Sequence, residues 1–303
     1  MTPFGRHPVD AELRTYIEEV RDGLMEETQA ERCDWNGVIR VHVVRDARGR
    51  PTPLGRAYPD GTMSLRTDLL DALRDMRQRP DVQPSGAALH QQQEAQQEAE
   101  HVVCHELIHF LVPRAQRFYQ GLQPYRHFAG FALEEGSTEA AAQNHAGIAG
   151  SRLEPRSAGA THARKARTYP ELTPALREVA AYVGRLRGES ARTVIDALAR
   201  ETPLGKLDRL PRMVLEARGL WDRIPEQQRT LCERALREAV WNELSLNRGW
   251  AERGGDNRLR TGDPEARSKI MGLRITAEVE RRRLAIEYGY GTPNRPEVPW
   301  QTI

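Results

Sequence analysis

The 303-residue sequence has few features of secreted, membrane-bound or disulfide-stabilised proteins. Its three cysteines, Cys33, Cys104 and Cys232, are widely spaced and form no C-x-x-C pair, so they indicate neither a disulfide framework nor a structural zinc knuckle. No apolar run approaches the length of a membrane span, and residues 1–10 lack the basic start and apolar stretch of a signal peptide. We therefore expect a cytoplasmic protein with no membrane partner, and export by a signal-independent machine stays open.

Lysine is also scarce, because it occurs only at positions 165, 206 and 269 among 45 basic residues. The net charge is +2, and charges of both signs are interspersed along the chain. Nucleic-acid binding normally requires a concentrated basic patch, so nucleic acid is not expected as a partner. The hydrophobic content of 39% and the charged content of 29% are those of a globular chain that can form one large or two ordinary domains.

Histidine occurs only nine times, but two histidines belong to the motif H-E-L-I-H at residues 105–109. On a helix, residues four apart share a face, so His105 and His109 can reach one metal ion. Glu106 is rotated from them by one residue, which lets its carboxylate approach a water on the metal as a general base. The motif predicts a catalytic zinc site, with Zn²⁺ as the cofactor.

The alternative for this motif is a pair of solvated histidines on an amphipathic helix. Val102, Val103, Phe110 and Leu111 flank the motif, so the helix is apolar on nearly every face and should be buried. Buried polar side chains need partners, and a metal would satisfy all three. Cys104 falls on a different helical face from the histidines, which indicates core packing.

A second predicted helix over residues 133–142 carries carboxylates at suitable spacing for a third ligand. Its pattern E-G-x-T-E, from Glu135 to Glu139, resembles the third-ligand helix of gluzincin metallopeptidases. By this resemblance Glu135 ligates zinc and Glu139 orients a liganding histidine through a hydrogen bond. Glu134 is a competing ligand, although its partner one turn later would be Thr138, and His127 is a further alternative.

Two other zinc-peptidase patterns fit less well. Metzincins require a glycine and a third histidine after the motif, at positions that Val112 and Ala115 occupy here. A small-metallopeptidase pattern of H-E-L-x-H followed by proline, histidine and an aromatic residue lacks its histidine near Ala115 or Gln116. The resemblance to gluzincins covers residues 102–143, so it indicates a clan rather than a family.

The fold class predicted is α+β and mostly helical, with a zincin-like core that holds a small, partly antiparallel sheet and the active-site helix. The periodicity predicts a helix over residues 13–24, strands over 38–44, 54–58 and 62–66, a helix over 69–76, and a long helix from the Gln-rich stretch at 90–97 to Pro113. One of the two short strands is expected to be an edge that binds the substrate main chain by strand addition.

The remainder of the chain is predicted to form a helical C-terminal subdomain, by analogy with gluzincins. Apolar periodicity marks helices near residues 176–183, 194–198, 231–244 and 270–286. The predicted domains are therefore a catalytic core at 1–150, a connection at 151–170, a helical subdomain at 171–290 and a tail at 291–303. Loops are predicted over residues 80–85 and 254–264.

Peptide hydrolysis also needs a hydrogen-bond donor for the oxyanion of the tetrahedral intermediate. Tyr169 is our first candidate, and the others are His162, Tyr125, His127, Tyr182, Tyr288 and Tyr290. Together these features predict a zinc-dependent metallopeptidase, an endopeptidase acting on a peptide or protein substrate. The alternatives are a regulatory or effector protease with a single partner protein as substrate, and a non-catalytic helical binding module that contains a metal. Glu106 favours catalysis, because a purely structural zinc has no use for a carboxylate beside the water site.

Overall fold

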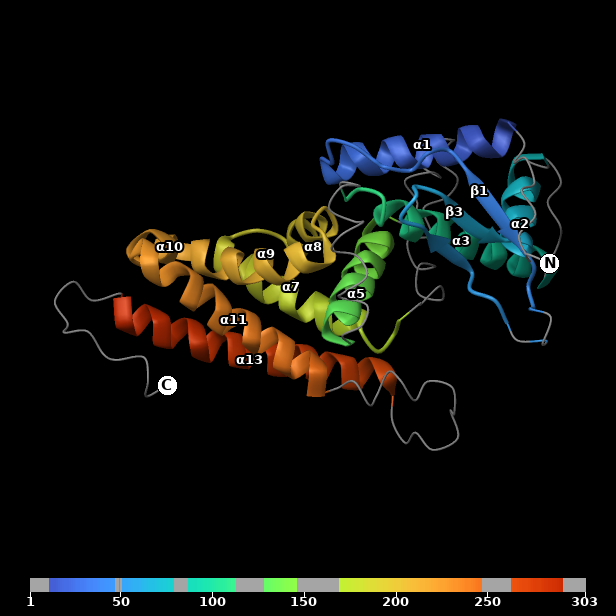
Figure 1. Cartoon of the computed structure of the whole chain (residues 1–303). Helices are drawn as coiled ribbons and strands as arrows, with labels where there is room; N and C mark the ends of the chain where they lie inside the picture. Colours follow the sequence, from blue (N-terminus) through green and yellow to red (C-terminus); the bar gives the residue numbers. More distant parts are fainter. Residues whose placement is uncertain are drawn as a thin grey trace. The chain divides into compact units, whose positions relative to one another are not determined.

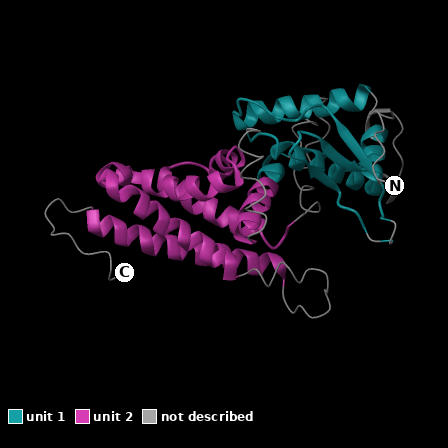
Figure 2. Cartoon of the chain, in the orientation of Figure 1, with its two compact units in different colours: residues 1–119, 141–168 teal, residues 120–140, 169–303 magenta. Residues whose placement is uncertain are grey.

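A computed structural model describes residues 11–46, 49, 51–78, 87–112, 128–145, 169–246 and 263–290 (Figure 1). The chain divides into two compact units, one formed by residues 1–119 and 141–168 and the other by residues 120–140 and 169–303 (Figure 2). Helix α5 (Phe128–His145) crosses this division. The first part of α5 is therefore grouped with the second unit, and the domain bounds expected from the sequence stay a prediction.

The first unit combines helices with a three-stranded mixed sheet. Strand β3 (Met63–Arg66) is central, β1 (Ile39–His42) pairs with it in parallel, and β2 (Gly55–Ala57) pairs with it in antiparallel orientation. The predicted small, partly antiparallel sheet is thus confirmed. Helix α1 (Ala11–Thr28) buries the apolar side chains whose spacing predicted it, and α2 (Thr67–Gln78) follows β3 directly.

Helix α3 (Ala87–Ile108) carries the first part of the H-E-L-I-H motif. Its Gln-rich early turns are largely solvated, whereas every side chain from residue 101 to residue 112 is buried. The helix ends at Ile108, so the prediction that it continues to Pro113 is wrong. The last turn tightens, since Phe110 N donates to Leu107 O at 2.8 Å and Leu111 N donates to Ile108 O at 3.0 Å.

The second unit is helical. Beyond the first part of α5, it contains α7 (Thr173–Arg187), α8 (Ala191–Ala199), α9 (Pro203–Glu216), η2 (Ala217–Gly219), α10 (Leu220–Arg223), α11 (Glu226–Leu246) and α13 (Pro264–Tyr290). The four helices predicted in this part of the chain correspond to α7, α8, α11 and α13. Helix α9 was not predicted, because Gly205 and Pro211 argue against a helix there. Pro203 nevertheless fits its first turn, and the Thr202 hydroxyl accepts a hydrogen bond from Gly205 N at 2.8 Å as a cap.

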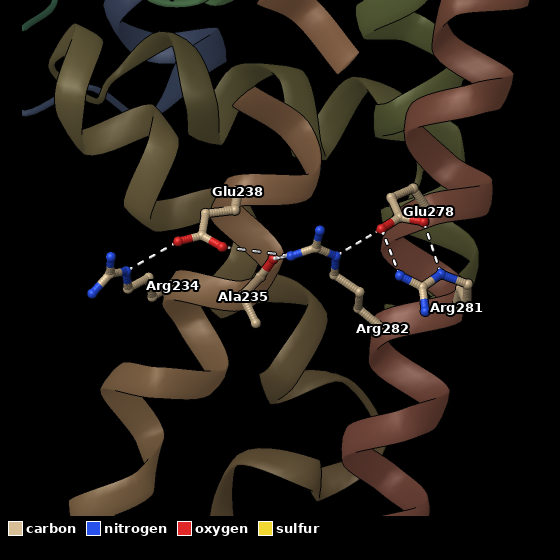
Figure 3. A network of polar contacts seen from close by, with 6 residues as sticks. All are labelled: Arg234, Ala235, Glu238, Glu278, Arg281 and Arg282. Atoms are coloured by element: carbon tan, nitrogen blue, oxygen red, sulfur yellow. Dashed lines mark hydrogen bonds and ion pairs between the residues drawn. The ribbon is translucent and has the colours of Figure 1, made fainter. Parts of the chain in front are cut away.

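Close helix packing and charged contacts join the helices of the second unit. Ala175 N of α7 donates to the hydroxyl of Ser268 on α13 at 3.1 Å. Arg282 of α13 donates to Ala235 O of α11 at 2.6 Å and to Glu278 at 2.8 Å (Figure 3). Arg281 also binds Glu278, and together with Arg282 it lowers the pKa of that carboxyl to about 2.

None of the described helices combines the length and apolar character that crossing a bilayer requires. The elements described above form a mostly helical α+β chain with a small mixed sheet, which is the fold class predicted from the sequence.

Candidate metal centre

The two histidines of the motif lie together at the end of α3. Their rings are 5.0 Å apart between centroids and nearly perpendicular, at 74°. His105 is 6% exposed and His109 is 9% exposed, so both imidazoles are withdrawn from solvent. The helix end that carries them is fixed from the N-terminal segment, because Asp34 N donates to Phe110 O at 2.8 Å.

Glu135 of α5 completes a group of three metal-ligating side chains. One ligand atom from each of His105, His109 and Glu135 lies within 4.8 Å of the others, and Glu135 is 7% exposed. Two neutral imidazoles and a carboxylate form a donor set suited to a divalent transition metal, and a metal also offsets the cost of burying a carboxylate. This buried group could hold a metal ion.

Glu106 lies against the edge of the sheet. A Cβ atom at Gly55 would meet Glu106 Cγ, Glu106 Oε1 and Val102 Cγ1 at 2.8 Å each, so the absence of a side chain at Gly55 makes room for the carboxylate. Strand β2 pairs only with β3 among the described strands, which makes residues 54–58 the edge and residues 62–66 the central strand.

The segment before β2 is anchored by contacts with the end of β1. His42 Nε2 is 2.6 Å from Pro53 O, and Thr52 N donates to Val44 O at 3.0 Å. Arg66 N of β3 donates to Leu54 O at 2.9 Å. These bonds set the position of Gly55 and hence the position of the backbone beside Glu106.

Glu134, the competing ligand, forms an ion pair instead. Its Oε2 lies 2.6 Å from Nζ of Lys206 on α9, and both side chains are buried. The two groups are in electrostatic contact without the alignment of a good hydrogen bond. The structure therefore gives the two neighbouring carboxylates different surroundings: Lys206 for Glu134, and the histidine pair for Glu135.

Glu139 is fully buried one turn after Glu135 on α5. Arg177 of α7 donates to the neighbouring Ala140 O at 3.2 Å. Burial lowers the pKa of Arg177, and the negative charge of Glu139 opposes that effect by raising it. The positive charge of Arg177 therefore acts on Glu139. The hydrogen bond expected between Glu139 and a liganding histidine stays a prediction.

Tyr169 lies four residues before Thr173, the first residue of α7. Its carbonyl accepts hydrogen bonds from Leu172 N at 2.9 Å and Thr173 N at 3.1 Å. Its backbone has a φ of +61°, which is uncommon for a residue with a side chain, and its ring packs edge-on against Phe131 at 5.9 Å. Phe131 is four residues before Glu135 on α5, so the ring is near the ligand helix, while the role of its hydroxyl stays a prediction.

The other candidates for the third ligand and for the oxyanion donor have varied outcomes. His127, Tyr125 and His162 lie outside the described residues. Tyr182 donates to Glu280 at 2.5 Å, and burial together with this carboxylate raises its pKa. Tyr288 is 60% exposed on α13.

Sequence analysis missed two buried residues near the predicted ligands. His101 lies one turn before His105 on α3 and is 4% exposed, and the spacing H-x-x-x-H-E-x-x-H is the signal that could have identified it. Lys206 was missed because its helix was not predicted. By contrast, Cys104 belongs to the core as expected, because its side chain is only 2% exposed, and this burial raises the pKa of its thiol to about 12.

No protein-family model, curated protein or solved structure matches this chain. A function for the chain is therefore argued from the residues of the site and their surroundings.

Proposed function

We propose that the protein is a zinc-dependent metallopeptidase of the gluzincin type, an endopeptidase that hydrolyses a peptide or protein. The observation that carries this proposal is the buried group of His105, His109 and Glu135, with Glu106 in the same motif beside a sheet edge. A structural zinc site normally has four protein ligands and has no use for a further carboxylate in the motif. Three ligands, with Glu106 beside an edge strand, therefore support a hydrolytic site.

Zinc is the metal that we propose for this group. Two imidazoles and one carboxylate are the protein ligands of many catalytic zinc sites, and they leave one coordination position open. Zinc bound there would act as a Lewis acid that makes a water nucleophilic near neutral pH. The expectation for the purified protein is one zinc per chain by elemental analysis.

The chain's own residues would supply the other steps. We propose that Glu106 accepts a proton from the attacking water and then delivers it to the departing amine. The substrate main chain would pair with the outer edge of β2, which pairs only with β3 among the described strands and carries the exposed side chain of Arg56. A peptide on that edge would run beside Gly55, which lies against the Glu106 side chain. Glu139 would orient a liganding histidine, and Tyr169 would donate to the oxyanion.

Substitution of Glu106 by glutamine tests this proposal. The amide keeps the shape of the side chain but cannot accept the proton, so zinc should remain while cleavage of unfolded protein or peptide libraries is abolished. Glu94→Gln is the matched control, because Glu94 lies on the same helix and its ion pair with His90 is exposed. If Glu106→Gln cleaves as fast as the parent protein, the proposed mechanism is wrong.

A further inference from the structure

The ion pair between Lys206 and Glu134 is unusual in two respects. Lys206 is fully buried, and it is one of only three lysines in a chain whose basic residues are nearly all arginine. Moving two charges out of water has a large desolvation penalty, and the attraction between the charges often offsets it only in part. Stability alone is therefore a weak reason for such a pair, and a role in specifying an arrangement is a stronger one.

Local structure fixes where the lysine side chain begins. The Thr202 hydroxyl caps α9 by accepting from Gly205 N, and Lys206 N donates to Thr202 O at 2.8 Å. Lys206 thus sits at the start of α9, close to the helix end where the backbone dipole disfavours a positive charge. The Glu134 carboxylate, 2.6 Å away, supplies the opposing charge that this position needs.

The partner of Lys206 is the residue directly before the predicted ligand. Successive side chains on an α-helix point about 100° apart, so a carboxylate held toward α9 at position 134 fixes the direction in which position 135 points. Glu134 and Glu135 are chemically identical, and both are buried. Without a distinguishing contact, either carboxylate would be attracted to a metal held by the histidine pair.

We propose that Lys206 is a positioning residue that selects the third metal ligand: by pairing with Glu134 it keeps that carboxylate from the metal and leaves Glu135 as the ligand. This inference rests on the proposed metal site. It assigns to α9, a helix distant in sequence from the motif, a direct influence on which residues hold the metal.

The ligand set can be read from the visible absorption spectrum of the Co²⁺-substituted full-length protein, and the affinity from competition between Zn²⁺ and a chromophoric chelator. In Lys206→Met the buried Glu134 charge loses the opposing charge of Lys206 and competes for the metal. The cobalt spectrum should therefore change, and zinc should bind roughly 10-fold more weakly, as for other residues that orient metal ligands. In the double variant Lys206→Met/Glu134→Gln the competitor is removed, so both the spectrum and the zinc affinity should return close to those of the parent protein.

A role in folding alone predicts a different pattern. Both variants would then lower the melting temperature, while the cobalt spectrum and the zinc affinity of the folded protein would equal those of the parent. That result, or a double variant as perturbed as the single one, would overturn the proposal. If Lys206→Met does not fold, Lys206→Leu provides the same test, because its apolar side chain can neither neutralise nor hydrogen-bond the carboxylate, and a parental spectrum in Lys206→Leu would overturn the proposal as well.

Failure of this inference is distinguishable from failure of the proposed function. A parent protein that binds no zinc, or that cleaves equally well with Glu106→Gln, would refute the peptidase site. A parent protein that binds zinc tightly and cleaves peptides, with Lys206→Met unchanged in spectrum and affinity, would refute only the role of Lys206.

Discussion

Gly55 of the edge strand lies directly against Glu106 of the motif: a Cβ atom at position 55 would be 2.8 Å from both Cγ and Oε1 of the glutamate. Real Cβ atoms do not approach so closely, so any other residue at position 55 must displace the carboxylate or the strand. The position of Glu106 therefore depends on Gly55 having no side chain. The space beside Glu106 is as much a part of the proposed site as the carboxylate itself.

Gly55→Ala should therefore lower the turnover number of peptide cleavage while zinc content stays at the parental level. A displacement of about 1 Å at a reacting group can cost roughly 100-fold in rate, and the loss should approach that size. Arg56→Ala is the control in the same strand, since Arg56 is exposed. Parental turnover in Gly55→Ala would show that the carboxylate does not need the space.

Glu135→Gln should lose zinc, because the amide is a much weaker ligand than the carboxylate that it replaces. His127→Ala should keep zinc, and elemental analysis of the two purified variants compares them directly. Full zinc retention in Glu135→Gln together with loss in His127→Ala would move the third ligand to His127. Each variant should be checked for native circular dichroism before its metal content is compared.

Glu139→Gln should keep zinc but bind it roughly 10- to 100-fold more weakly, the range found for partners that orient metal-ligating histidines. Chelator competition measures this change. Arg177 lies close to Glu139, so a loss of folding is a separate possible effect and is measured by thermal unfolding. Unchanged affinity in a folded Glu139→Gln variant would remove the orienting role that we assign to this residue.

Cys33 should be the only cysteine that reacts readily with iodoacetamide in the folded protein at mildly alkaline pH. The reactive form is the thiolate, and burial raises the pKa of Cys104 to about 12 and that of Cys232 to about 11. Cys33 is partly exposed. Peptide mass spectrometry identifies the labelled positions, and unfolding in urea should make all three react. Rapid native labelling of Cys104 would contradict the buried core beside the motif.

Gly272→Ala should destabilise the helical unit. The added Cβ would lie 2.7 Å from Ala175 O and 2.8 Å from Ala175 Cα, and a backbone cannot yield by rotating a side chain. Overpacking of this kind costs about 1–3 kcal/mol, which exceeds the roughly 1 kcal/mol of helix propensity that alanine gains over glycine. Urea unfolding measures the difference, with Arg274→Ala on the exposed face of α13 as the control. Equal midpoints for Gly272→Ala and the parent would exclude this close contact.

Much of the fold could be predicted, because periodicity reports which face of an element is buried. The spacing of Leu13, Tyr16, Ile17, Val20 and Leu24 predicted α1, and all five side chains are buried. Helix α9 could not be predicted in this way, since Gly205 and Pro211 lie inside it and both residue types disfavour a helix interior. The end of α3 was also misplaced, because the turn after Ile108 is tightened and its Phe110 carbonyl accepts from Asp34 N, a residue far away in the sequence.

In the candidate site, too, residues close together in the sequence could be predicted, whereas contacts between distant residues could not. His105, Glu106 and His109 follow from one local pattern, and helical spacing connects Glu135 with Glu139. The contacts of Glu134 with Lys206 and of Glu106 with Gly55 join residues far apart in the sequence. No local pattern contains them, so only the folded chain shows how the two adjacent glutamates differ.

The most direct test of the peptidase assignment is identification of new protein termini in extracts treated with the zinc-loaded parent protein and, side by side, with Glu106→Gln at equal zinc content. The account predicts a set of new termini with the parent that is absent with Glu106→Gln, and a single cleaved protein would indicate a regulatory or effector protease. Identical termini in the two samples, or no new termini with a parent protein that holds zinc, would contradict it.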